Sequence, residues 1–457
     1  MPSSFMYHPS SYRDSSGFLF YEDGVLYRQV NLVFKKDFDR FINGGLYQHL
    51  VERNLLIPHQ TINQNLTGHP EWYQTLQPEV LPFISYPYEW CFDMLKDAAL
   101  LTLEVAKEAM NFGMMLKDAS AYNVQWNKGR MIFIDTLSFE GYDEQKPWIA
   151  YRQFCEHFFA PMALTHYLKE PVQNLLLSYP EGIPLGLVKK LLPLKSKFNL
   201  HSYLHLHLHG AVALKSKKSN QDAKPFSKTK MKNLLQSLED GIRSFSLSKK
   251  SGVWSDYYDE AHQRKDYVAN KKEIIGNGTG KLPVKTVFDA GGNNGEFSEL
   301  LRDRVDSIIC ADFDHYSINH FYNRIKEKKI ANIHAVIIDL SNPSPAIGAN
   351  NKERASFIER TKTDLVLALA LIHHLAIGKN IPFDSVAELF YSTGRYLFIE
   401  FVPKEDEKVQ LMLQQKRDVY SWYTEEAFLK SFEKKFSILS KEKIGDSGRT
   451  LYLMQGL

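Results

Sequence analysis

The sequence predicts two domains of mixed α and β structure, joined by a lysine-rich segment. Its 457 residues are about three times the roughly 150 residues of a typical domain. Residues 215–232 contain seven lysines, one acid and almost nothing apolar, so we expect a linker over 215–235. The chain then divides into an α+β domain over 1–214 and an α/β domain over 236–457. We expect the second domain to contain a mostly parallel sheet with helices on both faces.

Five short apolar runs in the C-terminal half alternate with helical stretches. The runs are rich in β-branched residues, and each ends near an acid, a glycine or a polar turn. This alternation is typical of a parallel sheet, which binds ligands at the carboxyl ends of its strands. The expected strands cover 285–292, 306–314, 334–340, 363–371 and 395–402, and the clearest expected helices cover 296–303 and 317–329.

Composition and charge exclude several classes of protein. Lysine and arginine outnumber the acids by 56 − 53 = 3, so nothing demands a nucleic-acid partner. Cys91, Cys155 and Cys310 lie far apart, which excludes a disulfide scaffold and a cysteine zinc site. The first residues lack an apolar signal region, and no apolar run approaches the 18 or so residues of a membrane span. We therefore expect a cytoplasmic protein without a membrane span.

A glycine-containing loop follows the first expected strand of the C-terminal half. The loop residues are Asp289, Gly291, Gly292, Asn293 and Gly295, and an amphipathic helical stretch follows directly. Glycines at a strand-to-helix turn let the backbone approach a ligand where side chains would block it. The spacing lacks the final offset of the dinucleotide fingerprint G-x-G-x-x-G, which favours S-adenosylmethionine as the ligand.

The ends of the next strands carry further candidate residues. Asp312 lies 21 residues after Gly291, where a carboxylate could accept both ribose hydroxyls, and Asp339 is positioned for the adenine amino group. His373 and His374 follow the fourth strand and are expected over the pocket. An aromatic segment before the first strand is expected to form a helix that covers the cofactor, with Tyr258 as a contact and Trp254 and Tyr257 beside it.

These motifs resemble class I S-adenosylmethionine-dependent methyltransferases over roughly residues 250–457. Stretches such as LKDASAYNVQW, PWIAYRQFCEHF and LALALIHHLAIG resemble, more narrowly, full-length bacterial proteins of the nodulation-type NoeA family. The resemblance implies a Rossmann-like sheet and a methyltransferase, acting on a saccharide or another small molecule. Asn293 stands where the family usually has glycine, but asparagine tolerates positive φ better than other side chains do.

Methyl transfer to oxygen or nitrogen can require a base near the reacting atoms. His373 and His374 are the nearest candidates, because a neutral imidazole can accept a proton near pH 7. In the alternative interpretation one histidine caps the strand end and the other packs beside the cofactor. Glu400 and Asp406, near the end of the fifth strand, are second-rank candidates.

The N-terminal half contains a pattern typical of kinase-like folds. Asp118 and Asn123 are five residues apart, and Asp135 follows after a hairpin-like turn at 127–129. In kinase-like folds such an aspartate orients the substrate hydroxyl, and the asparagine and second aspartate hold Mg²⁺ for ATP. An expected hinge strand over 83–90 and helix over 93–113 precede the loop, and an early hairpin turns at Asp23-Gly24.

The departures from the kinase pattern favour a binding role over phosphoryl transfer. Leu116 and Lys117 replace the usual residues before Asp118, no glycine-rich phosphate loop is visible, and Arg28 stands where a phosphate-binding lysine is expected. Three interpretations stay open: a methyltransferase with an accessory kinase-like domain, a bifunctional kinase–methyltransferase, and a non-catalytic nucleoside-binding scaffold. For Asp118 and Asn123, a simple polar turn network also stays open.

Four histidines alternate with leucines near the end of the N-terminal half. His201, His205, His207 and His209 would share one face of a strand and could bind a metal, whereas in a helix they would scatter. Because no carboxylate flanks them, we expect a structural or partly exposed set and no metal site.

Overall fold

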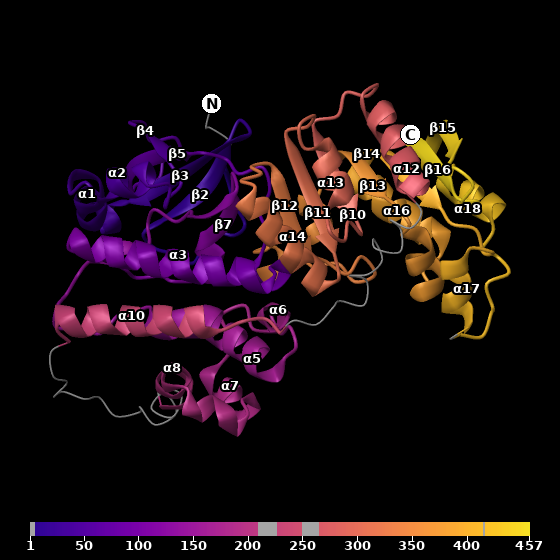
Figure 1. Cartoon of the computed structure of the whole chain (residues 1–457). Helices are drawn as coiled ribbons and strands as arrows, with labels where there is room; N and C mark the ends of the chain where they lie inside the picture. The colour runs from indigo at the N-terminus through magenta and orange to yellow at the C-terminus, as the bar shows by residue number, and fades with distance from the viewer. Residues whose placement is uncertain (1–4, 209–225, 249–264, 415) are drawn as a thin grey trace. The chain divides into compact units, whose positions relative to one another are not determined.

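A computed structural model gives the fold of the chain as two compact units (Figure 1). Unit 1 consists of Met1–Lys249 with Ile347–Arg354, and unit 2 of Lys250–Ala346 with Ala355–Leu457. Each unit is described by itself. The structure describes residues 5–208, 226–248, 265–414 and 416–457. Within these residues no helix is both long and apolar enough to cross a membrane.

Unit 2 is built on one seven-stranded sheet of order β12-β11-β10-β13-β14-β16-β15. The first five strands in this order are parallel to one another, and β16 runs antiparallel to both β14 and β15. The strands are β10 (Thr286–Ala290), β11 (Ser307–Asp312), β12 (Ile333–Ile337), β13 (Thr363–Ala368), β14 (Gly394–Phe401), β15 (Phe436–Lys443) and β16 (Thr450–Gly456). The five strands expected from the sequence and the mostly parallel sheet are confirmed.

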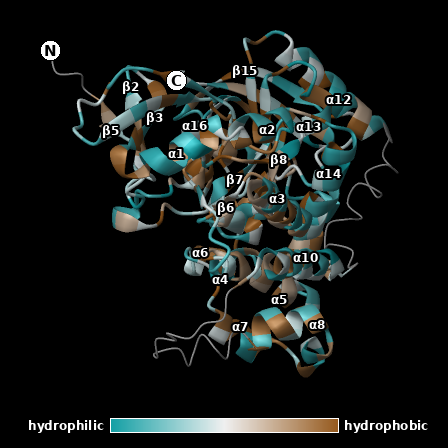
Figure 2. Ribbon diagram, turned by 90° about the vertical axis from the view of Figure 1, so that its left-hand side faces the viewer, coloured by the Kyte–Doolittle hydropathy of each residue, from teal (hydrophilic) through white to brown (hydrophobic). Residues whose placement is uncertain are grey.

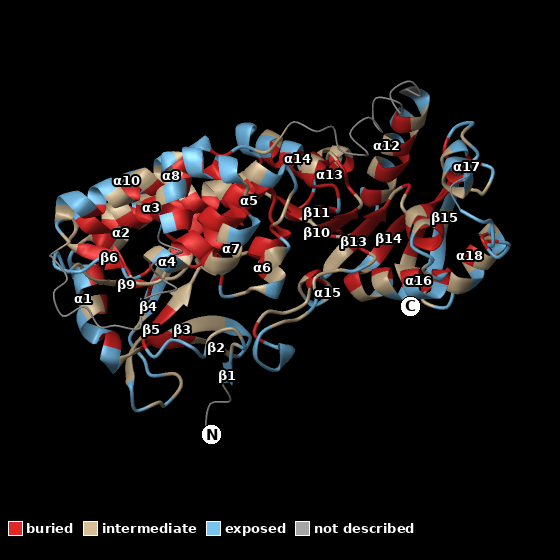
Figure 3. Ribbon diagram, turned by 90° about the horizontal axis from the view of Figure 1, so that it is seen from below, coloured by how far each residue is buried: buried red, intermediate tan, exposed pale blue. Residues whose placement is uncertain are grey.

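Helices cover both faces of this sheet. Figure 3 shows α12, α13 and α14 on one side of the strands and α15 and α16 on the other, with the strands between them buried. The helices of unit 2 are α12 (Lys265–Thr279), α13 (Glu296–Leu301), α14 (His315–Glu327), α15 (Phe357–Arg360), α16 (Phe383–Thr393), α17 (Glu407–Gln414) and α18 (Glu425–Phe432). The two expected helices correspond to α13 and α14.

The strand order reverses at β10, and this reversal creates a place for a ligand. From β10 the chain adds β11 and β12 on one side and β13 and β14 on the other. The connections that leave β10 and β13 therefore diverge, and a crevice opens at the carboxyl ends of the central strands.

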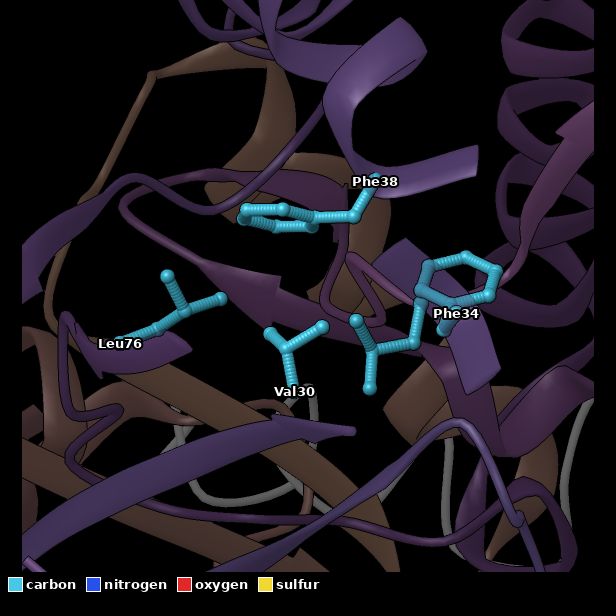
Figure 4. Packing of buried hydrophobic residues seen from close by; sticks show 5 residues of the cluster. Val30, Phe34, Phe38 and Leu76 are labelled. Atoms are coloured by element: carbon cyan, nitrogen blue, oxygen red, sulfur yellow. The ribbon is translucent and has the colours of Figure 1, made fainter. Parts of the chain in front are cut away.

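Unit 1 begins with a five-stranded antiparallel sheet of order β1-β2-β3-β5-β4. Its elements are β1 (Met6–Tyr7), β2 (Gly17–Glu22), β3 (Val25–Asn31), β4 (His59–Ile62), β5 (Trp72–Pro78), α1 (Lys35–Asn43) and α2 (Leu46–Glu52). The hairpin expected at Asp23-Gly24 joins β2 and β3, and both turn residues have positive φ (50° and 78°). Figure 4 shows the core against the sheet, where Val30 and Leu76 meet Phe34 and Phe38.

A long helix and two small hairpin-like pairs follow in unit 1. These elements are α3 (Phe92–Asn111), β6 (Met114–Leu116), β7 (Val124–Asn127), β8 (Arg130–Phe133) and β9 (Phe139–Gly141). A two-residue turn at Lys128 and Gly129, both with positive φ, joins β7 and β8 as expected. The hinge strand expected over 83–90 was wrong. Pro87–Glu89 is a 3₁₀ turn, in which Pro87 suits the first helical position and Glu89 accepts the backbone N–H of Tyr86 at 2.9 Å.

The remainder of unit 1 is helical. Its elements are α4 (Tyr151–Phe154), a π-helical turn (Cys155–Phe159), α5 (Ala160–Leu168), α6 (Leu175–Ser178), α7 (Leu185–Leu191), a 3₁₀ helix (Leu194–Phe198), α8 (Leu200–Ser202), a second π-helical turn (Tyr203–Leu208) and α10 (Lys228–Ser244). α10 lies alongside α3 in Figures 1 and 2.

The lysine-rich linker expected over 215–235 differs from the structure in its last part. Residues 228–235 belong to α10, whose Met231, Leu235 and Leu238 are buried. These apolar residues recur at helical spacing and form one buried stripe. Because lysines surround them in the sequence, the composition of the segment is typical of a linker although its spacing is typical of a helix. Residues 215–225 lie outside the described part of the chain. The division into compact units falls after Lys249, later than the expected start of the second domain at 236.

Candidate functional site

A cavity in unit 2 opens at the carboxyl ends of the central strands. Its walls come from the loop after β10, the ends of β11, β12 and β13, and one face of α12. Seven of the residues singled out from the sequence line this cavity: Asp289, Gly291, Gly292, Asn293, Asp312, Asp339 and His374. Gly295 and His373 are not among the lining residues, and Tyr258 lies outside the described residues.

The glycine loop is held tightly against β11. The N–H groups of Gly291 and Gly292 donate to the carbonyl of Ala311 at 2.8 and 3.1 Å. A Cβ at Gly292 would fall 2.5 Å from Cys310 Sγ, so this position accepts only glycine without a shift of the strand. Gly295 has φ of +71°, and a Cβ there would collide with the ring of Phe321 at 2.0 Å. Gly295 is therefore required for packing against α14.

Asp312, the last residue of β11, is tied to the loop by its side chain. Its Oδ2 accepts the N–H of Asn293 at 2.9 Å and its Oδ1 accepts the N–H of Asp314 at 2.8 Å. Asn293 has a φ of 47° and takes the conformation that the loop needs. Burial of Asp312 raises the pKa of its carboxyl to about 6, against the effect of the two N–H donors.

The two other acids of the cavity differ from each other. Asp289 is buried and accepts the Ser298 hydroxyl at 2.7 Å, and burial raises the pKa of Asp289 to about 6. Asp339 is partly exposed and accepts the Ser341 hydroxyl at 2.5 Å and the Lys379 ammonium at 3.3 Å. Burial alone would raise the pKa of Asp339, but these donors outweigh it and hold the pKa below its usual value.

The paired histidines meet ring to ring just after β13. Their ring centroids are 4.1 Å apart. Burial lowers the pKa of His374 to about 4 and that of His373 well below its usual value. Both imidazoles are therefore neutral near pH 7, and only His374 reaches the cavity.

A buried network of charges lies behind one wall of the cavity. Glu400 Oε2 accepts Lys271 Nζ at 2.6 Å, and Glu400 Oε1 accepts the Tyr267 hydroxyl at 2.5 Å. Arg449 donates to Glu400 at 3.2 Å and to Asp406 at 2.8 Å. Burial alone would raise the pKa of Glu400, but the two cations hold it below its usual value. The second-rank candidates Glu400 and Asp406 thus belong to this network and not to the cavity wall.

Sequence reasoning missed the residues that α12 contributes. Tyr267, Val268 and Lys271 line the cavity. One signal was available, because Lys271 lies three residues after Val268 and four before Ile275, within an otherwise apolar helical stripe. Arg449 follows a polar loop and gives no comparable signal.

The three residues singled out in the N-terminal half come together in unit 1. Asp118 is hydrogen-bonded to the Asn123 side chain, and Asn123 Nδ2 donates to Ser138 Oγ at 3.3 Å. The Ser138 hydroxyl donates to Asp135, which also forms an ion pair with Arg28. A continuous chain of polar contacts therefore links Arg28 to Asp118.

The pKa values of the two acids in this polar cluster are shifted in opposite directions. Burial and the nearby Asp135 charge raise the pKa of Asp118. Burial would also raise the pKa of Asp135, but Arg28 outweighs it and the pKa is lowered. Lys117 points elsewhere, since its Nζ donates to the Ser16 hydroxyl at 2.6 Å.

The histidine-rich segment is held by hydroxyl groups. His201 and His205 contact the Ser237 hydroxyl at 3.1 and 3.0 Å, and His207 contacts the Ser196 hydroxyl at 2.8 Å. The segment is helical, so His201 and His205, four residues apart, both face Ser237, whereas His207 faces Ser196. Among the described residues, no group of three His, Cys, Asp or Glu could hold a metal ion, and His209 lies outside them.

Comparison with known proteins gives one clear relative. The nodulation protein NoeA of Rhizobium meliloti (strain 1021) is 32% identical over 392 residues, which are 84% of this chain and 82% of the relative. No family model matches the chain.

Solved structures give weaker likenesses. WbdD is 18% identical, with 42% of this chain and 40% of WbdD covered and a TM-score of 0.28. The chain thus matches less than half of the length of WbdD. Magnesium protoporphyrin IX methyltransferase (ChlM) from Synechocystis PCC 6803, with bound SAH, is 16% identical over 42% of this chain and 86% of its own, with a TM-score of 0.29. With TM-scores below 0.5, these likenesses carry no functional argument.

Proposed function

Because this chain belongs to the family of the nodulation protein NoeA, we propose that it is a methyltransferase that uses S-adenosylmethionine. The observation that carries the proposal is the cavity of unit 2. Its lining contains the glycine loop together with Asp289, Asp312 and Asp339, which lie at or near the ends of three strands. The acceptor that we propose is a saccharide or another small molecule.

The chemistry of the lining suits an adenosyl group. Apolar side chains, among them Phe313, Ile338 and Leu340, give flat surfaces for a purine. Asp312 is proposed to accept the ribose hydroxyls, since each carboxylate oxygen can accept more than the single N–H it receives here. Asp339, at the next strand end, is proposed to accept the adenine amino group. The glycine loop, with Asp289 beneath it, leaves room for the amino-acid part of the cofactor.

The bound cofactor would supply an electrophilic methyl group on a sulfonium. The chain has then to align the acceptor, exclude water and, for a hydroxyl or amine acceptor, receive a proton. We propose that His374 receives it, because its imidazole is neutral and reaches the cavity. His373 is proposed to position His374 through the contact between the two rings.

Calorimetric titration with S-adenosylmethionine tests the proposal. We expect saturable binding to the full-length protein and a loss of at least about tenfold in affinity for Asp312→Ala. Asp303→Ala is the matched control, since the Asp303 side chain is 85% exposed. Folded wild-type protein that binds neither S-adenosylmethionine nor S-adenosylhomocysteine would contradict the proposal. Binding without methyl transfer to any acceptor in a broad screen would favour the scaffold interpretation.

For unit 1 we propose an accessory, kinase-like binding role. The observation behind it is that Asp118, Asn123 and Asp135 share one polar cluster. The cluster does not fit a Mg²⁺ site in its present form, because Arg28 already neutralises Asp135. We therefore derive no phosphoryl-transfer step.

Phosphate transfer from ATP, assayed in the presence of Mg²⁺, separates this role from a bifunctional kinase–methyltransferase. We expect no transfer of labelled phosphate from ATP to candidate saccharide acceptors. Transfer that disappears in Asp118→Ala would establish the bifunctional interpretation instead.

A further inference from the structure

The helical part of unit 1 exposes an unusual set of large apolar side chains. They lie within one short stretch of chain, from α7 to the second π-helical turn, whose elements pack on one another. Phe198 is 90% exposed, Leu194 73% and Leu200 65%. Leu191, Tyr203 and Leu208 are each 43% exposed. We call these six residues the apolar patch.

The patch is not the unfilled half of a core. The same helices already bury an inner set of apolar residues, including Leu185, Val188 and Leu206. His205 and His207 are also turned inward and are held by the hydroxyls of Ser237 and Ser196. Because these residues already form the buried side, Leu194, Phe198 and Leu200 gain little from the fold of unit 1. Large apolar side chains that are exposed on neighbouring elements are typical of an interaction site.

The charged residues within this stretch of chain are all of one sign. Residues 182–208 contain four lysines and no aspartate or glutamate. Lys190, Lys195 and Lys197 are exposed, and Lys189 is partly exposed. Lys195 and Lys197 lie on either side of the buried Ser196, between Leu194 and Phe198. Exposed hydrophobic residues and exposed lysines therefore alternate along this stretch. In Figure 2 the ribbon of α7 and α8 accordingly carries both hydrophobic and hydrophilic colours.

We propose that the apolar patch docks on the surface of an anionic lipid bilayer. Leucine and phenylalanine side chains insert at the boundary of headgroups and acyl chains, while lysines remain at the level of the phosphates. Short helical elements with apolar tips and basic flanks suit this geometry, and no membrane span is needed. The lysines beside the patch are complementary in charge to anionic headgroups. They favour the bilayer over a second copy of this chain, because two such patches face to face would bring like charges together. The proposal does not depend on the chemistry of unit 2.

Co-sedimentation of the full-length protein with vesicles tests this docking. The vesicles are made of phosphatidylcholine alone or of phosphatidylcholine with 30% phosphatidylglycerol, at low and at physiological salt. We expect binding to the anionic vesicles only, and weaker binding as salt rises. Lys195→Gln with Lys197→Gln should weaken binding about fivefold per lysine, and Leu194→Ser with Phe198→Ser should weaken it more than tenfold.

Matched variants elsewhere on the surface serve as controls. Leu439→Ser removes another exposed leucine, 46% exposed, and Lys36→Gln with Lys430→Gln removes two other exposed lysines. These variants should bind vesicles as the wild type does. Circular dichroism of each variant checks that it is folded before its binding is compared with that of the wild type.

Two results would overturn the proposal. The first is equal binding of the wild type and Leu194→Ser/Phe198→Ser to anionic vesicles. The second is concentration-dependent self-association in sedimentation velocity without lipid, lost in the same variant, which would assign the apolar patch to a second copy of the chain.

Discussion

Two aspartates at the ends of strands, one buried and one half-buried, show how the hydrogen-bond and ion-pair partners of an acid set its pKa. Asp312 is the last residue of β11 in unit 2. Its carboxylate receives only backbone N–H groups, and burial raises its pKa to about 6. Asp135 follows β8 in unit 1 and receives Arg28 and the Ser138 hydroxyl, and its pKa is lowered. Desolvation acts on both, and only the second has a cation to offset it.

The difference separates a site open to a ligand from one closed by the chain itself. A carboxylate that lines a cavity without a cation is costly in the free protein, and donors on a ligand would relieve that cost. A carboxylate already paired with a guanidinium has little to gain from another cation. The same residue type is therefore proposed to serve a cofactor in unit 2, whereas in unit 1 its charge is already balanced by Arg28.

Removing the cation of unit 1 should have the largest effect. Arg28→Met leaves Asp135 buried without its partner, and we expect a loss of about 3 kcal/mol in the free energy of unfolding in urea. Lys128→Met, which removes an exposed pair with Glu79, should cost less than about 1 kcal/mol. Similar losses in the two variants would show that Asp135 does not depend on Arg28.

Removing the acid of unit 2 should affect ligand affinity more than folding. Asp312→Ala deletes two hydrogen bonds proposed to reach the ribose, each worth about 1.5 kcal/mol or more, so affinity for S-adenosylmethionine should fall about 100-fold. Titration calorimetry measures this loss. A thermal midpoint that falls as far as in Arg28→Met would instead indicate that Asp312 mainly stabilises the loop.

Cofactor affinity should depend on pH through Asp312. The pKa of Asp312 in the folded protein, about 6, lies above the ordinary value of 3.8. The carboxyl group therefore loses its proton only as pH rises through about 6, and only then can both of its oxygens accept hydrogen bonds from the ribose hydroxyls. Affinity should rise about tenfold between pH 5 and pH 7, as the ionised fraction does. Asp312→Asn does not titrate, and its weaker affinity should stay flat between these pH values. An equally steep rise in that variant would assign the dependence to another group, such as Asp289.

The smallest expected effect is at the loop residue that departs from the family pattern. Asn293 has a φ of 47°, so Asn293→Gly should stabilise the protein by about 0.5 kcal/mol and keep the N–H that Asp312 accepts. Cofactor affinity should stay within about threefold of the wild type in the same calorimetric titration. A loss larger than tenfold would show that the Asn293 side chain itself contacts the ligand.

Local patterns in the sequence were enough to predict the central strands of unit 2 and the tight turns of unit 1. The central strands β10, β11 and β13 are largely buried on both faces, so each is mostly apolar, and this composition is visible in the sequence. Turns such as Asp23-Gly24 need residues with positive φ, which glycine, asparagine and aspartate adopt most readily, so the residue types predict the turn. Helix α10 escaped prediction because its buried stripe is diluted by lysines.

The sequence by itself determined the sheet, the glycine loop and the strand-end acids, because parallel strands bring their carboxyl ends to one edge. It also marked Asp118, Asn123 and Asp135 by spacing alone. Only the tertiary structure decided that Arg28 neutralises Asp135, that Lys271 and Arg449 surround Glu400, and that Phe198 is exposed. These facts depend on contacts between residues far apart in the chain, and on which face of an element finds a partner. Local pattern can indicate which face of a helix is buried, but it does not name the distant residue that the face contacts.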